Sequence, residues 1–567
     1  DDARFFFAAT GAYSAEAELQ ATLNAASEPI SDDLNQHPLC RFPARYRWLE
    51  GQGLVDRSVR QALSCPEYQQ WRTQVNATRL SLIFPAAYMN SPSSMYGHTF
   101  LRFDPADAEA GSLWLSWALN FGANITTDDN SLFYVYKGLF GGYPGQFNMM
   151  PYYRKIQEYN RMENRDMWEY PLNLTAAEVD QLLEHVWELK EINFDYFFFD
   201  ENCSFQLLEL LDLIRPDAQL TEGFDLHAIP ADTVRAVVDA GIAGEVIYRP
   251  ANRTRFDALS QSLSEQERQT VIRLSQTPLD PGELFDQQSP QRQQLLAQAG
   301  YDYLRLQQDG AVRDPDANRR SYQLLQMINA RPSEPLAEPA MPTDPVDGHY
   351  SGLLRAGVGQ RDHRNYGLLG YRIAYQDLLD ADEGFPRGAE LAMGELALRH
   401  YAGGTLKLEL LELLSIRSFS PRDALFKPWS WQVKAGLERV YSNTEHPDNL
   451  VAQVTGGGGV SYGFNQQQST LFGLLTGRFE INDRFSDPLA VGLGANLGLR
   501  HDFGPLQALA ETELMQLSSG SLRRQFELGG QYNLTPQQGV RASWSYRRHD
   551  DGQQDNSVTL EYRHYLQ

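Results

Sequence analysis

Between Tyr350 and Leu566, apolar side chains recur at every second position, and this period constrains the fold more than any other feature of the chain. In the segment 540–547 the apolar and aromatic residues alternate with polar ones, which are Arg541, Ser543, Ser545 and Arg547. About twelve segments of roughly ten residues repeat this pattern, with turn residues between them. Such a series is typical of a transmembrane antiparallel β-barrel, and an even number of strands brings both barrel ends to the same side.

A soluble β-sandwich or a lipocalin-like barrel is the alternative, and either would need a packed apolar interior. The polar rows of these segments instead carry charges such as Lys407. Charges inside and Leu, Trp and Tyr outside are the arrangement of an outer-membrane barrel. We therefore predict that the lumen receives Arg541, Glu527 and Arg563, and that the lipid-facing side carries Trp544, Tyr546, Leu522 and Phe526.

A proline-rich stretch separates the barrel from the rest of the chain. Pro332, Pro335, Pro339, Pro342 and Pro345 follow one another closely, so the stretch continues neither a helix nor a central strand and is predicted to be a linker. The expected organisation is an N-terminal helical segment (1–74), an α+β domain (75–250), a helical region (251–331), the linker (332–348) and the barrel (349–567).

The α+β domain (75–250) shows both strand and helix signals. The segments 79–84, 98–103 and 112–120 are rich in Leu, Phe and Trp and are predicted as strands. Thr175 and Glu178 form a capping box that opens a helix. A second helix is predicted from Cys203 to Ile214, where Arg215-Pro216 ends it.

The chain has only three cysteines. Cys40 and Cys65 lie close together in sequence, whereas Cys203 is alone. We predict a disulfide between the first two, which implies an oxidising compartment and leaves Cys203 as a free thiol.

The composition excludes some functions. A net charge of −24 argues against nucleic acid as a partner. No cluster of His, Cys and Asp has metal-ligand spacing, and the sequence indicates no cofactor. The chain opens on Asp1, and we expect a leader to have been removed.

Cys203 and His98 are the candidate catalytic pair. Cys203 stands at the start of an apolar helix, where the helix dipole favours a thiolate. Asp200 and Glu201 oppose this by raising the pKa of the thiol, so a general base is needed. His98 follows a Ser-rich loop and opens a predicted strand, and we expect its imidazole to approach the sulfur to within roughly 4 Å.

The base needs an orienting group. Asn120 is our candidate for accepting the imidazole N–H, with Ser116 and Tyr96 as alternatives. Asn202 is expected to cap the Cys203 helix and to donate to an oxyanion. Ser94 and Tyr96 are the remaining candidates for contacts with the oxyanion or substrate.

The motifs together resemble a known family. Gly97-His98-Thr99-Phe100, Lys137-Gly138-Leu139-Phe140 and Asn202-Cys203-Ser204 are similar to motifs in the periplasmic domain of Lnb-type lipoprotein acyltransferases. The His-before-Cys order also resembles the permuted papain-like fold of lecithin:retinol acyltransferases. The resemblance covers roughly residues 75–215. It implies Cys203 as nucleophile and His98 as base, in enzymes that move an acyl chain onto the N-terminal amine of a lipoprotein. Those enzymes carry membrane helices where this chain has a barrel.

The expected fold is therefore an α+β permuted papain-like domain with a helical extension, followed by a transmembrane β-barrel of about 12 strands. We expect a Gram-negative outer-membrane protein with its N-terminal domain in the periplasm. The expected activity is cysteine-dependent acyl transfer or hydrolysis on lipid or lipoprotein acyl groups. A periplasmic cysteine amidase or peptidase, and a non-enzymatic barrel transporter or assembly factor, are the alternatives. The oligomeric state stays open.

Overall fold

The computed structural model describes residues 2–29, 35, 37–56, 58, 64–87, 89, 95–106, 113–125, 137–138, 141–276, 279–308, 314–333, 338–442, 448–465, 467–485, 488–550 and 552–567. The chain divides into two compact units. The first consists mainly of Asp1–Leu259, and the second contains the barrel (Ala340–Gln567) and most of the helical region before it.

The N-terminal segment is helical and is closed by the predicted disulfide. Its helices are α1 (Ala15–Ala26), α2 (Pro38–Arg41), α3 (Pro43–Gly51) and α5 (Pro66–Val75). Cys40 and Cys65 are bonded, with their Cα atoms 5.4 Å apart, and Cys203 is the free cysteine, so this prediction is confirmed. The Trp187 indole N–H donates to the Cys40 carbonyl at 2.9 Å, which ties the disulfide segment to the domain that follows.

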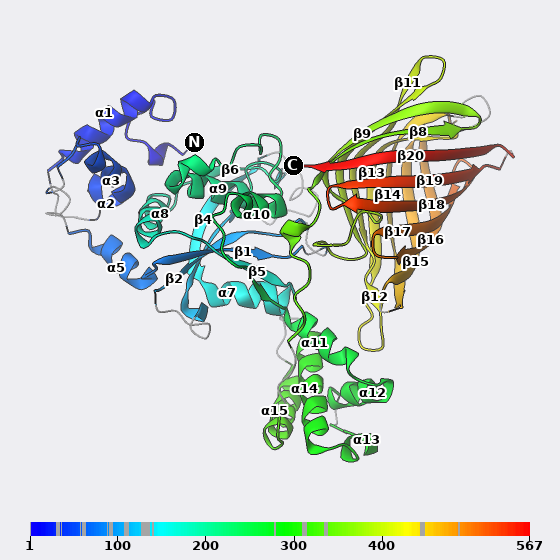
Figure 1. Cartoon of the computed structure of the whole chain (residues 1–567), viewed down its shortest axis with the longest axis horizontal. Coiled ribbons are helices and arrows are strands. Elements are labelled where there is room, and N and C mark those ends of the chain that lie inside the picture. The colour runs from blue at the N-terminus through cyan, green and yellow to red at the C-terminus, as the bar shows by residue number, and fades with distance from the viewer. Residues whose placement is uncertain are drawn as a thin grey trace. The chain divides into compact units, whose positions relative to one another are not determined.

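The first unit is built on a seven-stranded sheet in the order β6-β4-β3-β2-β1-β5-β7, with antiparallel pairs throughout (Figure 1). Its strands are β1 (Arg79–Pro85), β2 (Phe100–Asp104), β3 (Trp117–Ala123), β4 (Tyr143–Pro151), β5 (Met167–Pro171), β6 (Phe194–Tyr196) and β7 (Ile247–Arg249). The sequence placed two strand starts too early. His98 lies two residues before β2, and β3 begins at Trp117 because Leu113–Leu115 form a 3-10 turn.

Helices cover both faces of the sheet. On one side lie α8 (Ala176–Glu188), α9 (Cys203–Ile214) and α10 (Pro230–Asp239), which contact β1, β2 and β3, while α7 (Tyr152–Ile156) lies on the other side (Figure 1). Thr175 and Glu178 form the predicted capping box of α8. The α9 helix runs from Cys203 to Ile214, as its apolar run and the following Arg215-Pro216 predict.

A helical region precedes the barrel. Its helices are α11 (Asn252–Gln261), α12 (Glu265–Leu274), α13 (Glu283–Asp286), α14 (Pro290–Gln307) and α15 (Pro315–Asn329). Among the residues described, none of the helices of the chain is both long and apolar enough to cross a membrane.

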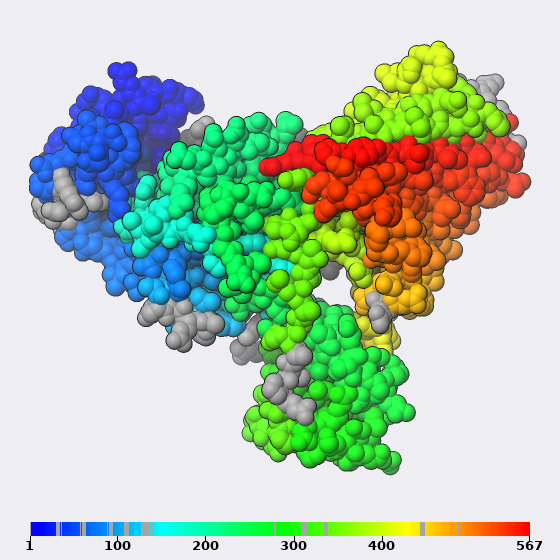
Figure 2. Space-filling view, in the orientation of Figure 1, coloured from blue at the N-terminus to red at the C-terminus, as the bar shows by residue number. Residues whose placement is uncertain are grey.

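Within the described part of the chain, twelve antiparallel strands form a closed barrel. They are β8 (Gly352–Arg361), β9 (Arg364–Gln376), β10 (Ala389–Tyr401), β11 (Thr405–Ser418), β13 (Ser430–Val440), β14 (Asn449–Phe464), β15 (Ser469–Ile481), β16 (Leu489–Asp502), β17 (Leu506–Leu517), β18 (Leu522–Thr535), β19 (Gln538–Arg548) and β20 (Gln554–Leu566). Each strand pairs with its sequence neighbour, β20 pairs with β8, and a short strand β12 (Pro421–Arg422) lies parallel to β14. In the space-filling view the orange and red strands lie directly against one another (Figure 2).

The two faces of the barrel wall follow the predicted alternation. Along β20, Val558, Leu560 and Tyr562 are exposed by 53%, 52% and 44%, whereas Glu561 and Arg563 are buried. Arg541 and Arg563 point into the lumen, where both bind carboxylates. Paired residues on neighbouring strands face the same side of the wall, and Glu527 pairs with Ser545 while Phe526 pairs with Tyr546. Glu527 therefore lies in the inward row. The outward rows carry Leu522, Phe526, Trp544 and Tyr546. The barrel therefore presents an apolar outer surface and a charged interior.

Candidate active site

Cys203 is the first residue of α9, and Asn202 caps this helix. The Asn202 side-chain oxygen accepts hydrogen bonds from the N–H groups of Ser204 and Phe205, at 2.9 and 3.3 Å. The helix is apolar and buried along most of its length, so it holds the Cys203 thiol rigidly beneath the surface. Cys203 itself is 7% exposed.

His98 reaches this thiol from the turn that precedes β2. Gly97 has a φ of +91°, a left-handed conformation that favours glycine, and a Cβ at this position would lie 2.5 Å from the Phe84 ring. The His98 N–H then donates to the Pro85 carbonyl at 3.3 Å, which fixes the turn against the end of β1. The loop geometry thus depends on the small residue before the histidine.

Cys203, His98 and Asn120 form a continuous chain of contacts. Nδ1 of His98 lies 3.0 Å from Sγ of Cys203, and Nε2 lies 2.6 Å from Oδ1 of Asn120. Asn120 sits in the middle of β3, whose hydrogen bonds to β2 and β4 hold it in place. If Nε2–H donates to the amide oxygen, Nδ1 is left as an acceptor that faces the thiol. The arrangement matches a nucleophile, a base and an orienting group.

The other sequence candidates take different positions. The Ser116 hydroxyl donates to Asp104 at 2.6 Å and is not the partner of His98. The Tyr96 ring is buried and lies 5.9 Å from the Phe198 ring, measured between centroids. Ser94 lies outside the described residues.

The prediction that Asn202 donates to an oxyanion is wrong, although its capping role is confirmed. Its amide N–H groups donate to the carbonyls of Phe198, Phe199 and Ala228, the last at 2.7 Å. Both ends of the amide are therefore occupied in holding the loop before α9 and the residue Ala228 near the helix start. The sequence suggested a cap but did not show that the donors were also in use.

The surroundings of His98 disfavour its charged form. Burial is the largest cause that lowers its pKa, to about 3, and the positive charges of Lys155 and Arg165 act in the same direction, while the Asn120 hydrogen bond opposes them. Both cations lie against Tyr159, whose ring centroid is 5.9 Å from that of His98. His98 is consequently a neutral imidazole at neutral pH.

Burial also raises the pKa of the Cys203 thiol. This differs from the sequence expectation, which attributed the rise to Asp200 and Glu201. Hydrogen bonds from the Thr99 backbone and hydroxyl, and from the N–H groups of Cys203 and Ser204, oppose it. The resting pair is therefore a neutral thiol beside a neutral imidazole, and attack by the sulfur would require the thiol proton to move to His98.

Thr99 is a site residue that the sequence reasoning missed. Its side chain is buried, and among the described residues its hydroxyl meets no partner, sulfur included, at full hydrogen-bond geometry. The hydroxyl acts on the Cys203 sulfur, where it favours the thiolate. The sequence could have indicated Thr99 through its position directly after His98, because a loop that brings His98 close to the sulfur also brings the next residue there.

Three aromatic side chains lie in the loop before Cys203. Phe197, Phe198 and Phe199 are consecutive and each is partly exposed. Phe197 fits against Gly141, where a Cβ would come within 2.5 Å of its ring. The loop thus offers apolar surface a few residues before Cys203.

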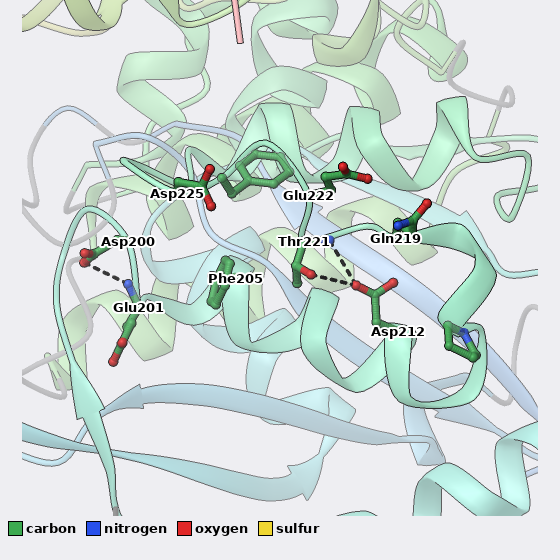
Figure 3. A pocket seen from close by; sticks show the side chains of 10 residues that line it. Asp200, Glu201, Phe205, Asp212, Gln219, Thr221, Glu222 and Asp225 are labelled. Atoms are coloured by element: carbon green, nitrogen blue, oxygen red, sulfur yellow. Dashed lines mark hydrogen bonds between the residues drawn. The ribbon is translucent and has the colours of Figure 1, made fainter.

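An acidic groove of about 560 Å³ lies along α9, between the residues just before the helix and the loop that follows it (Figure 3). Five carboxylates line it, from Asp200, Glu201, Asp212, Glu222 and Asp225. The Asp212 carboxylate accepts from the N–H groups of Leu220 and Thr221, so it shapes the loop that forms one wall. Burial, with repulsion from Asp200, raises the pKa of Glu201. Across the described part of the chain, no group of three or more His, Cys, Asp or Glu residues is arranged to hold a metal ion.

Comparisons with known proteins divide the chain in a similar way. Residues 67–240 match the family model of the Lnb N-terminal periplasmic domain. Residues 1–52, 246–332 and 342–565 match three domains of unknown function, DUF7843, DUF7842 and DUF7840. No curated protein matches the chain.

Several solved structures are similar to the barrel. The COG4313 outer membrane channel of Pseudomonas putida F1 is 12% identical with a TM-score of 0.26, covering 41% of this chain and 99% of that one. Omp33 of Acinetobacter baumannii is 12% identical with a TM-score of 0.22, covering 39% and 100%. An anion-selective porin of Comamonas acidovorans is 12% identical with a TM-score of 0.21, covering 38% and 98%.

The family match agrees with the fold and with the disulfide. Cys40 and Cys65 are bonded, which fits an oxidising compartment. The outer wall of the barrel is apolar and its interior is charged. The chain therefore joins a region matching the Lnb N-terminal periplasmic domain to a twelve-stranded β-barrel of the outer membrane.

Proposed function

We propose that the Lnb-type domain is a cysteine acyltransferase or acyl hydrolase that acts on lipid or lipoprotein acyl groups through a thioester. The observation that carries the proposal is the contact chain from Cys203 through His98 to Asn120, with distances of 3.0 and 2.6 Å. The permuted papain-like character of the site is part of the proposal. Its support is the order of the residues, with the base before a nucleophile that starts a helix.

The first half of the reaction forms the thioester. His98 Nδ1 takes the thiol proton while Sγ of Cys203 attacks the carbonyl carbon of the donor ester or amide. Asn120 holds the imidazolium through Nε2–H. His98 then gives the proton to the leaving alcohol or amine, and the acyl group stays on the sulfur.

The second half releases the acyl group. An acceptor amine or a water molecule loses a proton to Nδ1 as it attacks the thioester carbonyl, and the sulfur leaves and is reprotonated. An amine acceptor makes the enzyme a transferase, and water makes it a hydrolase. The phenylalanines before Cys203 support an acyl substrate, because they are apolar and partly exposed beside the nucleophile.

The test is to detect the acyl group on the sulfur. Full-length protein is isolated from outer membranes in detergent, and the peptide that contains Cys203 is analysed by mass spectrometry before and after hydroxylamine. We expect a fatty acyl mass that hydroxylamine removes, that is lost in Cys203→Ala and that is strongly reduced in His98→Ala. A peptidyl adduct would instead support the amidase or peptidase alternative. No adduct, with unchanged membrane lipids and lipoproteins in Cys203→Ser cells, would refute the enzymatic proposal and favour a binding module.

A further inference from the structure

The segment Asp377–Arg387 connects β9 to β10 at the end of the barrel where β8 begins and β20 ends, and its first half, Leu378–Ala381, is buried. Leu378, Leu379 and Asp380 are exposed by only 3%, 7% and 1%. A surface turn of an outer-membrane barrel would have accessible side chains. This connection has therefore folded inward.

Three arginines of the barrel wall bind the two aspartates of the segment. Asp380 is 2.7 Å from Arg372, 3.0 Å from Arg541 and 3.1 Å from Arg563. Asp377 is 3.2, 2.6 and 2.9 Å from the same three guanidinium groups. The arginines come from β9, β19 and β20, and all of them point into the lumen. Six ion pairs thus fasten the segment to this wall.

The segment also reaches the opposite wall. The Leu378 carbonyl accepts from Nε of Arg500 at 2.6 Å, and Asp382 lies 2.8 Å from the same guanidinium group. The Leu378 side chain packs with Phe472 and Leu474 in a buried apolar cluster. Arg500 lies on β16, and Phe472 and Leu474 lie on β15. Counted from β8, β15 is the sixth strand in either direction around the twelve-stranded barrel. The segment therefore crosses the lumen.

The stretch that leads into the barrel adds a further layer. The His349 ring stacks between Phe385 of the segment and Tyr565 of β20, with centroid distances of 4.1 and 4.3 Å. The Tyr565 hydroxyl donates to Asp380. Aromatic stacking and ion pairs thus fix both halves of the segment.

We propose that Asp377–Arg387 is a plug that closes the barrel to ions, and that its two aspartates occupy an arginine site that would take anions if the plug were absent. Three guanidinium groups converging on one place in a low-dielectric interior require negative charge. Rings of arginine are what anion-conducting pores use. Here the chain supplies the negative charge itself. The inference concerns the barrel and is independent of the chemistry at Cys203.

The test is electrical, on full-length protein in planar bilayers under a KCl gradient. Wild-type protein should add no steady conductance to the bare bilayer. A variant in which a short Gly-Ser turn replaces residues 378–387 should open discrete conductance steps. Its reversal potential should shift toward the chloride equilibrium potential, because Arg372, Arg541 and Arg563 each lose their ion pair with Asp380. The double variant Asp377→Asn/Asp380→Asn should shift it in the same direction, with smaller or intermittent steps.

Asp550→Asn is the matched control. Asp550 also pairs with an arginine, Arg524 at 3.4 Å, but it lies in the β19–β20 turn away from the plug. This variant should stay closed. Heat-modifiability on gels shows that each barrel is folded. Steady conductance through the wild-type protein would overturn the plug proposal. This measurement decides the question even if the variant with the Gly-Ser turn does not fold. If the variant with the Gly-Ser turn is folded and conducts cations in preference to chloride, the proposed anion site at the three arginines is overturned.

Discussion

Oδ1 of Asn120 lies 2.6 Å from Nε2 of His98, on the side of the imidazole ring away from Cys203. This contact favours the proton on Nε2 and holds the imidazole ring in the orientation in which Nδ1 faces the Cys203 sulfur. Asn120 comes from β3 and Cys203 from α9, so the base is held between two rigid elements.

Asn120→Ala should lower kcat/KM by about 10- to 100-fold, which corresponds to one hydrogen bond to a charged imidazolium of about 1.5–3 kcal/mol. The measurement is the rate of acyl transfer or of thioester formation. Asn148→Ala is the control, because Asn148 pairs with Asn120 across β3 and β4 and is exposed. Equal losses in the two variants would mean that Asn120 serves the sheet and not the base.

The low pKa of His98 predicts the pH profile. The base works only when neutral, so kcat/KM should stay level from neutral pH down to about pH 4 and fall as the pH passes through the His98 pKa of about 3. Circular dichroism should accompany each point to separate titration from unfolding. An acid limb near the ordinary histidine value of about 6.5 would contradict the burial of this ring.

His98 also links stability to pH. The unfolded chain takes up a proton at an ordinary histidine pKa, whereas the folded chain takes it up only near pH 3. Between these values the unfolded state binds more protons, so stability should fall as the pH is lowered through this range. His98→Gln should lose less stability than the wild type over the same range, as measured by urea unfolding at several pH values.

Thr99→Val should raise the pKa of Cys203 further, because it removes the hydroxyl that favours the thiolate and keeps the shape of the side chain. We expect the alkylation profile of the variant to move to higher pH. The rate of alkylation of Cys203 against pH measures it, and Thr99→Ser should behave as wild type. Superimposable profiles for the Val variant and the wild type would remove Thr99 from the site.

Gly97→Ala should impair the enzyme without unfolding the barrel. Its φ of +91° and the Phe84 ring, which would lie 2.5 Å from an added Cβ, leave no room for a side chain, so His98 should be displaced from Cys203. We expect a loss of thioester formation with an unchanged heat-modifiable barrel. Gly51→Ala is the control, since nothing lies within 4 Å of a Cβ there. Full activity in Gly97→Ala would show that the turn adapts.

Removing the disulfide should destabilise the first unit by about 3 kcal/mol, because the bond closes a loop in the unfolded chain. The variant is Cys40→Ser/Cys65→Ser, and the measurement is the urea midpoint followed by tryptophan fluorescence. The two cysteines are separated by 25 residues. A midpoint equal to that of the wild type would mean that packing alone holds the N-terminal helices.

Much of the fold follows from local patterns. The period of two in segments such as 540–547 predicts the barrel wall and which side chains face the lumen, because the alternation of strands is strict. The capping box at Thr175 and the apolar run after Cys203 predict α8 and α9. With only three cysteines, the pairing of Cys40 with Cys65 also follows from sequence distance.

The features that sequence could not supply depend on side chains meeting across the fold. Asp377 and Asp380 look like ordinary turn residues until Arg541 and Arg563, more than a hundred and fifty residues later, return to the same place. The boundary of β3 was missed because a 3-10 turn begins with the same apolar residues as a strand. Asn202 was predicted as an oxyanion donor because a sequence shows that an amide is present and not where its N–H groups donate.

The buried, protonated state of Cys203 has a consequence for its survival in the envelope. Oxidants and mixed disulfides react with thiolates, so a thiol with a raised pKa and 7% exposure is a poor target for either. The protein can therefore keep one cysteine reduced in the same compartment that oxidises Cys40 and Cys65. Under the proposed function, reactivity would arise only when a substrate carbonyl is present and His98 accepts the proton, which would make the sulfur selective for its substrate over the oxidants around it.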